Sequence, residues 1–384
     1  MHDRVAIIGV GWSGFRPVTP ELSYKELIYE AAVKAYADAN LDPRKDIESF
    51  VTVAEDFYEG TSIFDEYTPD QLGAVLKPVH TIGGDGLHLL ATACMLILTG
   101  QFSVVAVEGH SKASNVKTLP QVIGYAQDPI LNRPLRFNNH FIPGLDMNRY
   151  LFDTGTSLEQ CASVIVKNRR NALVNPSAPY GADLTLEDVL SGEPTAWPLN
   201  SHQIAHHADG AIVIVLASAD RVHSFTDKPV WVTGVGWCND SPALENREWG
   251  EAIYAREAAR MAFRQAGMLN PGRAIDFVEV DDVYGYKELQ SLEAMGFFRR
   301  GEAGKATEEG FTHPDGELPV NVSGGSQGFG DLLDANGLAR ALEVVLQLRG
   351  EAGPRQLESV STGLAQSWRG VPSASGAVVI MSGE

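Results

Sequence analysis

The sequence predicts an α/β fold built from two similar halves, because the same order of motifs occurs twice along the chain. A strand-like segment at residues 5–12, VAIIGVGW, returns at residues 230–237 as VWVTGVGW. Each copy is followed by an alanine-rich stretch, at 30–40 and at 257–267, whose small and apolar residues recur at helical spacing. Self-similarity over such long segments is typical of a duplicated supersecondary unit.

Three more pairs of segments repeat in the same order. They are second strands at 47–53 and 275–280, closing strands at 209–218 and 375–383, and glycine-led helices at 83–95 and 324–346. The first glycine-led helix is apolar nearly all round, which is typical of a helix that lies between two sheets. We therefore expect duplicated βαβ-type halves at 1–225 and 228–384, with an inserted loop domain at about 115–200 in the first half.

The composition restricts the class of protein. Hydrophobic residues make up 44% of the 384 residues, which is enough for a large buried core. The formal net charge of -19 argues against a nucleic-acid partner, since phosphate binding needs clustered lysine and arginine. The three cysteines form no CxxC pair, so the sequence suggests neither a disulfide framework nor a zinc site.

The N-terminal residues enter a predicted strand directly and do not show the pattern of a secretory signal peptide. The most apolar stretch, at about 87–99, is too short to cross a bilayer and carries His88. We therefore expect a cytoplasmic protein that has no membrane span.

Several phrases resemble one protein superfamily. They are EQCASVIVKNRRN at 159–171, LEDVL at 186–190, LEAMGF at 292–297, PVNVSGG at 319–325 and LQLRG at 346–350. Together with the duplicated half, they are similar to the thiolase superfamily, in the branch of sterol-carrier-protein-x and lipid-transfer-type thiolases. That branch includes archaeal acetoacetyl-CoA thiolases and steroid side-chain aldolases. The resemblance runs essentially end to end and implies a thiolase fold with its layers in the order αβαβα.

The resemblance also indicates which chemistry is missing. Thiolases acylate a cysteine at the N-terminus of the enclosed first-half helix, and that position falls on Gly83 in this chain. The second-half histidine of the family falls on Asp331, and the last catalytic region, at 362–370, contains neither cysteine nor histidine. None of the three cysteines stands at a matching position, so we expect all three to be structural. We therefore expect no thiolase activity.

Polar residues replace the missing groups. Asp85, Asp331 and Asp334 fall near the altered positions, and Asp282 and Tyr284 lie in a loop that should come close to them. Carboxylates and phenols in a closed cleft act as general acids and bases when burial moves their pKa values towards neutrality. We take Asp331, Tyr284, Asp85 and Asp282 as catalytic candidates. Structural alternatives stay open, since Asp85 would cap a helix, Asp282 has a family counterpart and Tyr284 would pack at a strand end.

Other residues are candidates for binding the substrate. His140 lies in the insertion, which lines the substrate tunnel in the relatives. Lys167, Arg169 and Arg170 resemble family positions near the coenzyme A entrance, where cations attract phosphates. The alternative for these three cations is a solvated helix C-terminus that positive charge stabilises.

Two glycines are further candidates for positions next to the substrate or coenzyme A. Gly83 and Gly325 belong to glycine pairs that we expect to serve in turns and close packing, since neither pair has a phosphate-loop pattern. We expect no metal site. The adjacent His206 and His207 would point to opposite sides of a strand and make a poor metal pair.

Two functions remain open from the sequence. The steroid side-chain aldolases that this chain resembles imply retro-aldol cleavage of a β-hydroxyacyl-CoA, which needs a base and enolate stabilisation but no covalent nucleophile. The chain departs from those aldolases at 281–282 and at 328–333. The alternative is a non-catalytic thiolase-fold subunit of a heteromeric thiolase or acyltransferase complex.

Both hypotheses imply the same ligand and the same kinds of partner. A coenzyme A thioester would be the substrate or ligand, and no covalently bound cofactor is expected. The family forms homodimers or thiolase-like heterodimers. Relatives on this branch often bind a small OB-fold and zinc-ribbon protein that helps to hold the acyl-CoA. The sequence leaves open whether the chain is itself an enzyme.

Overall fold

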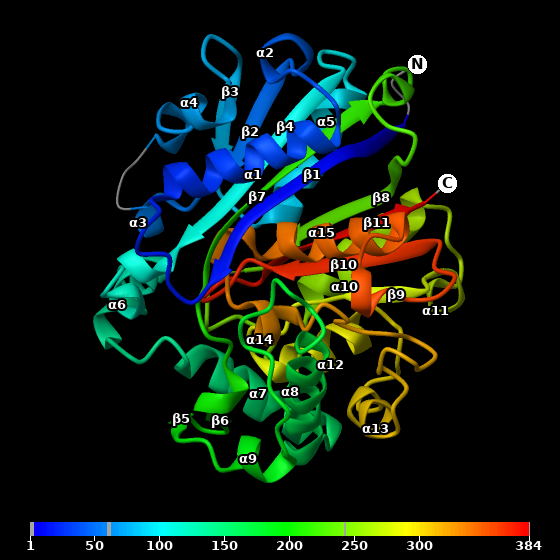
Figure 1. Ribbon diagram of the computed structural model, residues 1–384. Helices are drawn as coiled ribbons and strands as arrows, with labels where there is room; N and C mark the ends of the chain where they lie inside the picture. Colours follow the sequence, from blue (N-terminus) through cyan, green and yellow to red (C-terminus); the bar gives the residue numbers. More distant parts are fainter. Residues whose placement is uncertain (1–3, 60–62, 242, 384) are drawn as a thin grey trace.

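The computed structural model describes residues 4–59, 63–241 and 243–383. Its central feature is a mixed sheet of nine strands in the order β3-β2-β4-β7-β1-β8-β11-β10-β9, with helices packed against it (Figure 1). A separate two-stranded sheet, β5-β6, belongs to the inserted segment. The two halves of the chain therefore contribute neighbouring parts of one sheet.

The described residues form the following strands and helices. The strands are β1 (Val5–Arg16), β2 (Ser49–Val53), β3 (Val79–Ile82), β4 (Val104–Lys112), β5 (Pro194–Ala196), β6 (Leu199–Asn200), β7 (Asp209–Ser218), β8 (Val230–Asn239), β9 (Phe277–Glu279), β10 (Thr362–Trp368) and β11 (Ser375–Ser382). The α-helices are α1 (Tyr24–Asp38), α2 (Pro43–Asp46), α3 (Asp56–Glu59), α4 (Pro69–Leu72), α5 (Gly86–Leu98), α6 (Leu119–Ile123), α7 (Phe141–Thr154), α8 (Leu158–Ala172), α9 (Leu186–Leu190), α10 (Ile253–Gln265), α11 (Pro271–Ala274), α12 (Gly285–Ala294), α13 (Ala303–Glu308), α14 (Gly325–Phe329) and α15 (Asn336–Arg349).

The two parts of the sheet repeat one topology. β1 and β8 each pair antiparallel with the closing strand of their own half, β7 or β11. The closing strands pair antiparallel with β4 and β10, which in turn pair parallel with β2 and β9. β1 and β8 are also antiparallel neighbours, with Ile7 opposite Val230, and they join the two parts. The predicted duplication of the fold is confirmed, while the residue boundaries of the halves stay a prediction.

Burial of apolar faces produces five layers. α1 packs its small residues, including Ala31 and Ala35, on the outer face of the first-half strands. α5 and α15 lie between the two sets of strands, in a core that contains Ile7, Leu90 and Val345. α10 covers the outer face of the second-half strands. The layer order αβαβα agrees with the predicted fold class, and burial of these apolar faces is its main stabilising contribution.

The glycines that repeat in β1 and β8 have a steric cause. A β-carbon at Gly11 would stand 2.2 Å from the carbonyl oxygen of Ala31 in α1. A β-carbon at Gly236 would stand 2.0 Å from the carbonyl oxygen of Ala258 in α10. Each glycine therefore allows a helix backbone to approach its strand closely, and the same requirement in both halves explains the repeated motif.

The second glycine-led segment is not one continuous helix, contrary to the prediction. α14 ends just before Gly330, which adopts a φ of 103°, and α15 begins only at Asn336. Glycine adopts this conformation readily because it has no β-carbon, and the turn ends the helix. The break places Asp331 in a loop whose backbone hydrogen-bonds with that of His206 and Ala208.

The inserted segment contributes α7, α8 and α9, which lie below the sheet in Figure 1 together with α12 and α13 of the second half. α7 and α8 come from this segment and share a buried core with α12, which includes Met147, Val164 and Leu289. This contact brings the insertion against the second half. In the described part of the chain, no helix combines the length and the apolar character that a bilayer span requires.

Candidate active site

A small cavity of about 90 Å³ lies where the insertion meets the loops that follow β9 and β10. Its polar lining comes from residues far apart in the sequence: Tyr58, Asn139, His140, His207, Asp281, Tyr284, Asp331, Asn336 and Arg369. A hollow with a few convergent polar groups is typical of a ligand site. The predicted catalytic candidates Asp331 and Tyr284 and the binding candidate His140 therefore lie together.

One pair in the cavity joins His140 and Tyr284. His140 immediately precedes α7, Tyr284 immediately precedes α12, and Nδ1 of His140 lies 3.0 Å from Oη of Tyr284. The ring of Trp368 contacts the phenol with a centroid distance of 6.0 Å. Burial, and next the charge of Asp331, raises the pKa of Tyr284, so the phenol stays protonated. Burial, and next the charge of His207, lowers the pKa of His140, which favours the neutral imidazole.

The second pair joins His207 and Asp331. Nδ1 of His207 lies 3.2 Å from Oδ2 of Asp331, and Asn336 donates a hydrogen bond of 2.6 Å to Oδ1. The backbone N–H of Asp331 donates to the carbonyl of His206 at 2.7 Å, which fixes this loop beside the segment that leads to β7. Burial opposes the charged form of both side chains, but their mutual attraction is stronger. The pKa of His207 is therefore raised, and that of Asp331 is lowered.

The two histidines have opposite charge preferences although they line one cavity. The pKa of His140 is lowered and that of His207 is raised. A neutral imidazole accepts a proton, whereas an imidazolium donates one. Environments that push two pKa values apart in this way assign one group as base and the other as acid. The arrangement is therefore capable of general acid–base chemistry on a bound ligand.

Gly83, the position predicted for the thiolase nucleophile, faces an ion pair. A β-carbon at Gly83 would stand 3.2 Å from Nη2 of Arg369 and 3.7 Å from a carboxylate oxygen of Glu55. Nε of Arg369 donates to that carboxylate at 2.7 Å. Arg369 lines the cavity, whereas Gly83 is not part of its lining. At this predicted ligand position, Arg369 rather than Gly83 therefore lines the cavity.

The three cysteines all lie in the described part of the chain and away from the cavity lining. Cys94 is buried in α5 and Cys161 in α8, and burial raises the pKa of both thiols, to about 12 for Cys94. Cys238 lies in β8, and burial raises its pKa as well. A thiol with a raised pKa is a poor nucleophile, so these cysteines supply no thiolate to the site.

Asp85 joins the beginnings of the two enclosed helices and does not line the cavity. Its carboxylate accepts hydrogen bonds of 2.9 Å from the N–H of Leu87 in α5 and of 2.9 Å from the N–H of Gly337 in α15. The side chain is buried, and burial raises its pKa. This geometry supports the capping alternative for Asp85 over a catalytic role.

Asp282 also satisfies a helix beginning. It accepts hydrogen bonds from the backbone N–H of Ser326 at 2.7 Å and of Gln327 at 3.2 Å, and from Nδ2 of Asn168 at 2.9 Å. Burial raises the pKa of Asp282 to about 7. A β-carbon at Gly325 would stand 2.2 Å from Oδ2 of Asp282, so Gly325 serves this close packing. Neither residue belongs to the cavity lining.

The three cations predicted near a coenzyme A entrance have different surroundings. Lys167 is buried and pairs with Glu288 at 2.9 Å. Arg169 is buried, donates to the carbonyl of Tyr180 at 2.9 Å, and has a pKa lowered by burial. The side chain of Arg170 is 61% exposed. Lys167 and Arg169 are thus engaged inside the protein, whereas Arg170 lies at the surface, where its Nη2 pairs with Asp183 at 2.8 Å.

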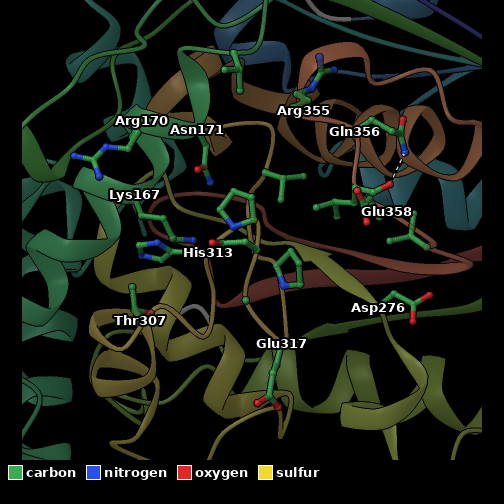
Figure 2. Close-up of a pocket in the computed structure, with 18 of the residues that line it drawn as sticks. Lys167, Arg170, Asn171, Asp276, Thr307, His313, Glu317, Arg355, Gln356 and Glu358 are labelled. Carbon is green, nitrogen blue, oxygen red and sulfur yellow. Dashed lines mark hydrogen bonds between the residues drawn. The ribbon is translucent and has the colours of Figure 1, made fainter.

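A larger groove of about 1390 Å³ lies beside α8 and shares no lining residue with the cavity. Figure 2 shows Lys167, Arg170 and Asn171 on one wall of this groove. Carboxylates and two further arginines contribute to the lining: Asp276, Glu308, Asp315, Glu317, Glu358, Arg273 and Arg355. Because charges of both signs surround it, the groove does not form a concentrated phosphate-binding cluster.

The sequence analysis did not select six polar residues that line the cavity: Tyr58, Asn139, His207, Asp281, Asn336 and Arg369. The pairing of His207 with Asp331 depends on a β-bridge between distant segments. The signal for this pair in the sequence was the two adjacent histidines, His206 and His207, just before β7. Among the described residues, no group of three or more His, Cys, Asp or Glu side chains is arranged to hold a metal ion.

Comparison with known proteins identifies relatives along the whole chain. The family described as thiolase C-terminal domain-like matches residues 238–382. Over 373 residues the chain is 32% identical to acetyl-CoA acetyltransferase of Methanothermobacter thermautotrophicus, and the match covers 96% of each protein. It is 28% identical over 383 residues to sterol carrier protein 2 of Bos taurus, which covers 95% of this chain and 70% of that protein.

Solved structures share the fold. The structure described as "Ltp2-ChsH2(DUF35) aldolase" matches with a TM-score of 0.85 at 24% identity, covering 99% of this chain and 97% of the other. Human mitochondrial 3-ketoacyl-CoA thiolase matches with a TM-score of 0.75 at 16% identity, covering 99% of each chain. Together with the end-to-end sequence similarity, this means that the chain belongs to the thiolase superfamily, in its sterol-carrier-protein-2-like branch.

Proposed function

We propose that this protein cleaves a carbon–carbon bond of a β-hydroxyacyl-CoA by retro-aldol chemistry. One observation carries the proposal: His140 with a lowered pKa and His207 with a pKa raised by Asp331 line the same cavity. Retro-aldol cleavage needs a base at the β-hydroxyl group and an acid at the α-carbon, without a covalent nucleophile. The cavity contains both kinds of group.

In the proposed reaction, Tyr284 and His140 remove the proton of the β-hydroxyl group. Oη of Tyr284 accepts this proton while its own proton passes to Nδ1 of His140, 3.0 Å away. The relay leaves the phenol neutral, which agrees with the raised pKa of Tyr284. The bond between the α- and β-carbons then breaks, the β-carbon becomes a carbonyl carbon, and the electron pair forms the enolate of the thioester.

His207 completes the reaction as the acid. Its Nδ1 faces Asp331 at 3.2 Å, which leaves Nε2 as the proton donor to the α-carbon of the enolate. The products are a ketone or aldehyde and a shortened acyl-CoA. One proton has moved onto His140 and one has left His207, and solvent exchange restores both, so the cycle balances.

The relatives support coenzyme A thioesters as the substrate class. One relative is an acetyl-CoA acetyltransferase, and human mitochondrial 3-ketoacyl-CoA thiolase, with a TM-score of 0.75, has been solved in complex with CoA. A similar structure is described as an aldolase. We infer a coenzyme A thioester as the substrate and no covalently bound cofactor. Thiolysis is not proposed, because Gly83 takes the place of the nucleophile.

Two kinds of partner are part of the proposal. β3 forms one edge of the sheet, Leu76 just before it is 98% exposed, and Leu98 at the end of the following helix α5 is 40% exposed. An open edge strand with apolar surroundings favours pairing with a second thiolase-like chain, in a homodimer or heterodimer. The structure described as "Ltp2-ChsH2(DUF35) aldolase" supports a further partner, which we infer to be a small OB-fold and zinc-ribbon protein.

Cleavage of β-hydroxyacyl-CoA by the protein, purified with its natural partners, tests the proposal. Tyr284→Phe is expected to lower kcat about 10²- to 10⁴-fold, because the relay loses its hydroxyl group. Tyr36→Phe is the matched control, since it removes a buried phenol that donates to the carbonyl of Leu72 at 2.8 Å, away from the cavity. The control should leave kcat unchanged.

Two results would contradict the lyase proposal. Full activity of Tyr284→Phe would exclude the relay. Two findings together would favour the non-catalytic subunit. The wild-type assembly would fail to cleave β-hydroxyacyl-CoA of any chain length, and it would contain a second thiolase-like chain with an intact Cys-Ala-Ser-Gly motif.

A further inference from the structure

A cation outside the acid–base relay is held firmly beside it. Arg369 follows β10, and its backbone N–H donates to the carbonyl of Ser375 in β11 at 3.0 Å. Its Nε donates to Glu55 at 2.7 Å, and its Nη2 contacts the same carboxylate. Glu55 follows β2, and its backbone N–H donates to Asp334 at 2.7 Å. The guanidinium is therefore held from both halves of the molecule.

One end of this guanidinium is left for a ligand. The side chain of Arg369 is 33% exposed and lines the cavity together with Tyr284 and Asp331. Its hydrogen bonds to Glu55 use Nε and Nη2, and Nη1 has no hydrogen-bond partner among the described residues. A β-carbon at Gly83 would stand 3.2 Å from Nη2, so the glycine leaves room for the guanidinium.

The proposed reaction creates a charge that the relay does not neutralise. Breaking the carbon–carbon bond places negative charge on the thioester oxygen, and preorganised donors at such an oxygen lower the barrier strongly. A helix N-terminus is one source of donors, but Asp85 already caps that of α5. His207 is needed as the proton donor. Arg369 is the remaining cation among the cavity residues that the structure describes.

We propose that Arg369 is a catalytic residue that binds the thioester oxygen, and that Glu55 is the positioning residue that holds it there. The inference rests on the proposed retro-aldol function and adds the group that stabilises its enolate. As the electron pair of the broken bond moves onto the enolate, Nη1 of Arg369 donates a hydrogen bond to the oxygen and keeps its proton. Proton transfer from His207 to the α-carbon then restores the neutral thioester.

Two measurements on the partner-bound protein test this inference. One is cleavage of a β-hydroxyacyl-CoA. The other is exchange of the α-protons of acetyl-CoA in D₂O, followed by mass spectrometry, which needs the enolate but no cleavage. Arg369→Gln should lower both rates about 10²- to 10³-fold and leave KM nearly unchanged, as expected for an interaction made mainly in the transition state. Arg299→Gln, whose arginine is 89% exposed, is the matched control and should change neither rate.

Variants at the same position separate lost chemistry from a lost fold. Arg369→Lys keeps the charge and should retain more activity than Arg369→Gln, and added guanidinium should restore part of the rate of Arg369→Ala. Glu55→Gln should lower kcat by a smaller factor, because it loosens the guanidinium without removing it. Thermal unfolding shows whether each variant is folded.

The outcomes distinguish this inference from the proposed function. If Arg369→Gln keeps both rates within about threefold while Tyr284→Phe is inactive, Arg369 does not bind the enolate and the lyase proposal stands. If the wild type exchanges α-protons without cleaving, and Arg369→Gln does not exchange, the assignment of Arg369 stands and the lyase proposal is overturned. If the wild type does neither, both are overturned.

Discussion

At the residue scale, the carboxylate of Asp331 interacts with two neighbouring side chains. It pairs with His207 at 3.2 Å and accepts a hydrogen bond of 2.6 Å from Asn336. The pKa of His207 is raised by this contact although burial acts against it. His140 contacts the phenol of Tyr284, and its pKa is lowered. Two imidazoles that line one cavity therefore have pKa shifts of opposite sign because their neighbours differ.

The pH dependence of kcat/KM tests these roles. The rate should fall in acid as His140 becomes protonated, and in alkali as His207 loses its proton, which gives a bell-shaped profile. Asp331→Asn removes the charge that raises the pKa of His207. The alkaline limb should therefore move to lower pH, while the limb of His140 stays in place. The matched control is Asp227→Asn at an exposed position; an unshifted alkaline limb in Asp331→Asn would contradict the assignment.

At the element scale, one carboxylate caps two helices. Asp85 accepts hydrogen bonds from the first turns of α5 and α15, both buried. Asp85→Ala should lower the free energy of unfolding by about 2–4 kcal/mol, because two buried N–H groups lose their acceptor. Asp85→Asn keeps an acceptor and should cost less. Urea unfolding measures both changes.

Asp42 offers the control for this cap. It accepts a hydrogen bond from the N–H of Arg44 at an exposed helix beginning, so Asp42→Ala should cost only about 0.5 kcal/mol. Equal losses in Asp85→Ala and Asp42→Ala would argue against the double cap. A stable but inactive Asp85→Asn would instead support the catalytic role that the sequence suggested.

The repeated glycines give a second prediction at this scale. Gly11→Ala and Gly236→Ala should each lower the free energy of unfolding by about 1–3 kcal/mol, because the new methyl group meets a helix carbonyl. Gly124→Ala is the control, since a β-carbon there meets nothing within 4 Å. Unchanged stability in either variant would show that the helix and strand can move apart without lowering the free energy of unfolding.

At the scale of the whole molecule, the open edge at β3 bears on assembly. Leu76 precedes this strand and Leu98 ends α5, and both are exposed. Leu76→Lys combined with Leu98→Lys should lower the assembled mass measured by light scattering, since charges on an apolar contact surface oppose association. Leu269→Lys, at a residue 101% exposed in the second half, is the control. An unchanged mass in the double variant would place the contact elsewhere.

The fold was largely predictable because its signals lie within single elements. The glycine motif of β1 returns in β8, and the alanine spacing of α1 returns in α10. The site was less predictable, because His140, His207 and Tyr284 come from separate segments and meet only through long-range packing. Asp85 and Asp282 resembled catalytic carboxylates in the sequence, but buried helix beginnings also need acceptors. Sequence spacing alone does not distinguish a catalytic carboxylate from one that caps a helix.

The ion pair of Arg369 and Glu55 affects how a thiolase nucleophile could be introduced into this site. Gly83→Cys would add a β-carbon 3.2 Å from Nη2 of Arg369, so the guanidinium would have to shift by a few tenths of an ångström against its ion pair with Glu55. The histidine that the family resemblance places at Asp331 would also have to be introduced. Thiolase chemistry would therefore require changes at more than one position of this site.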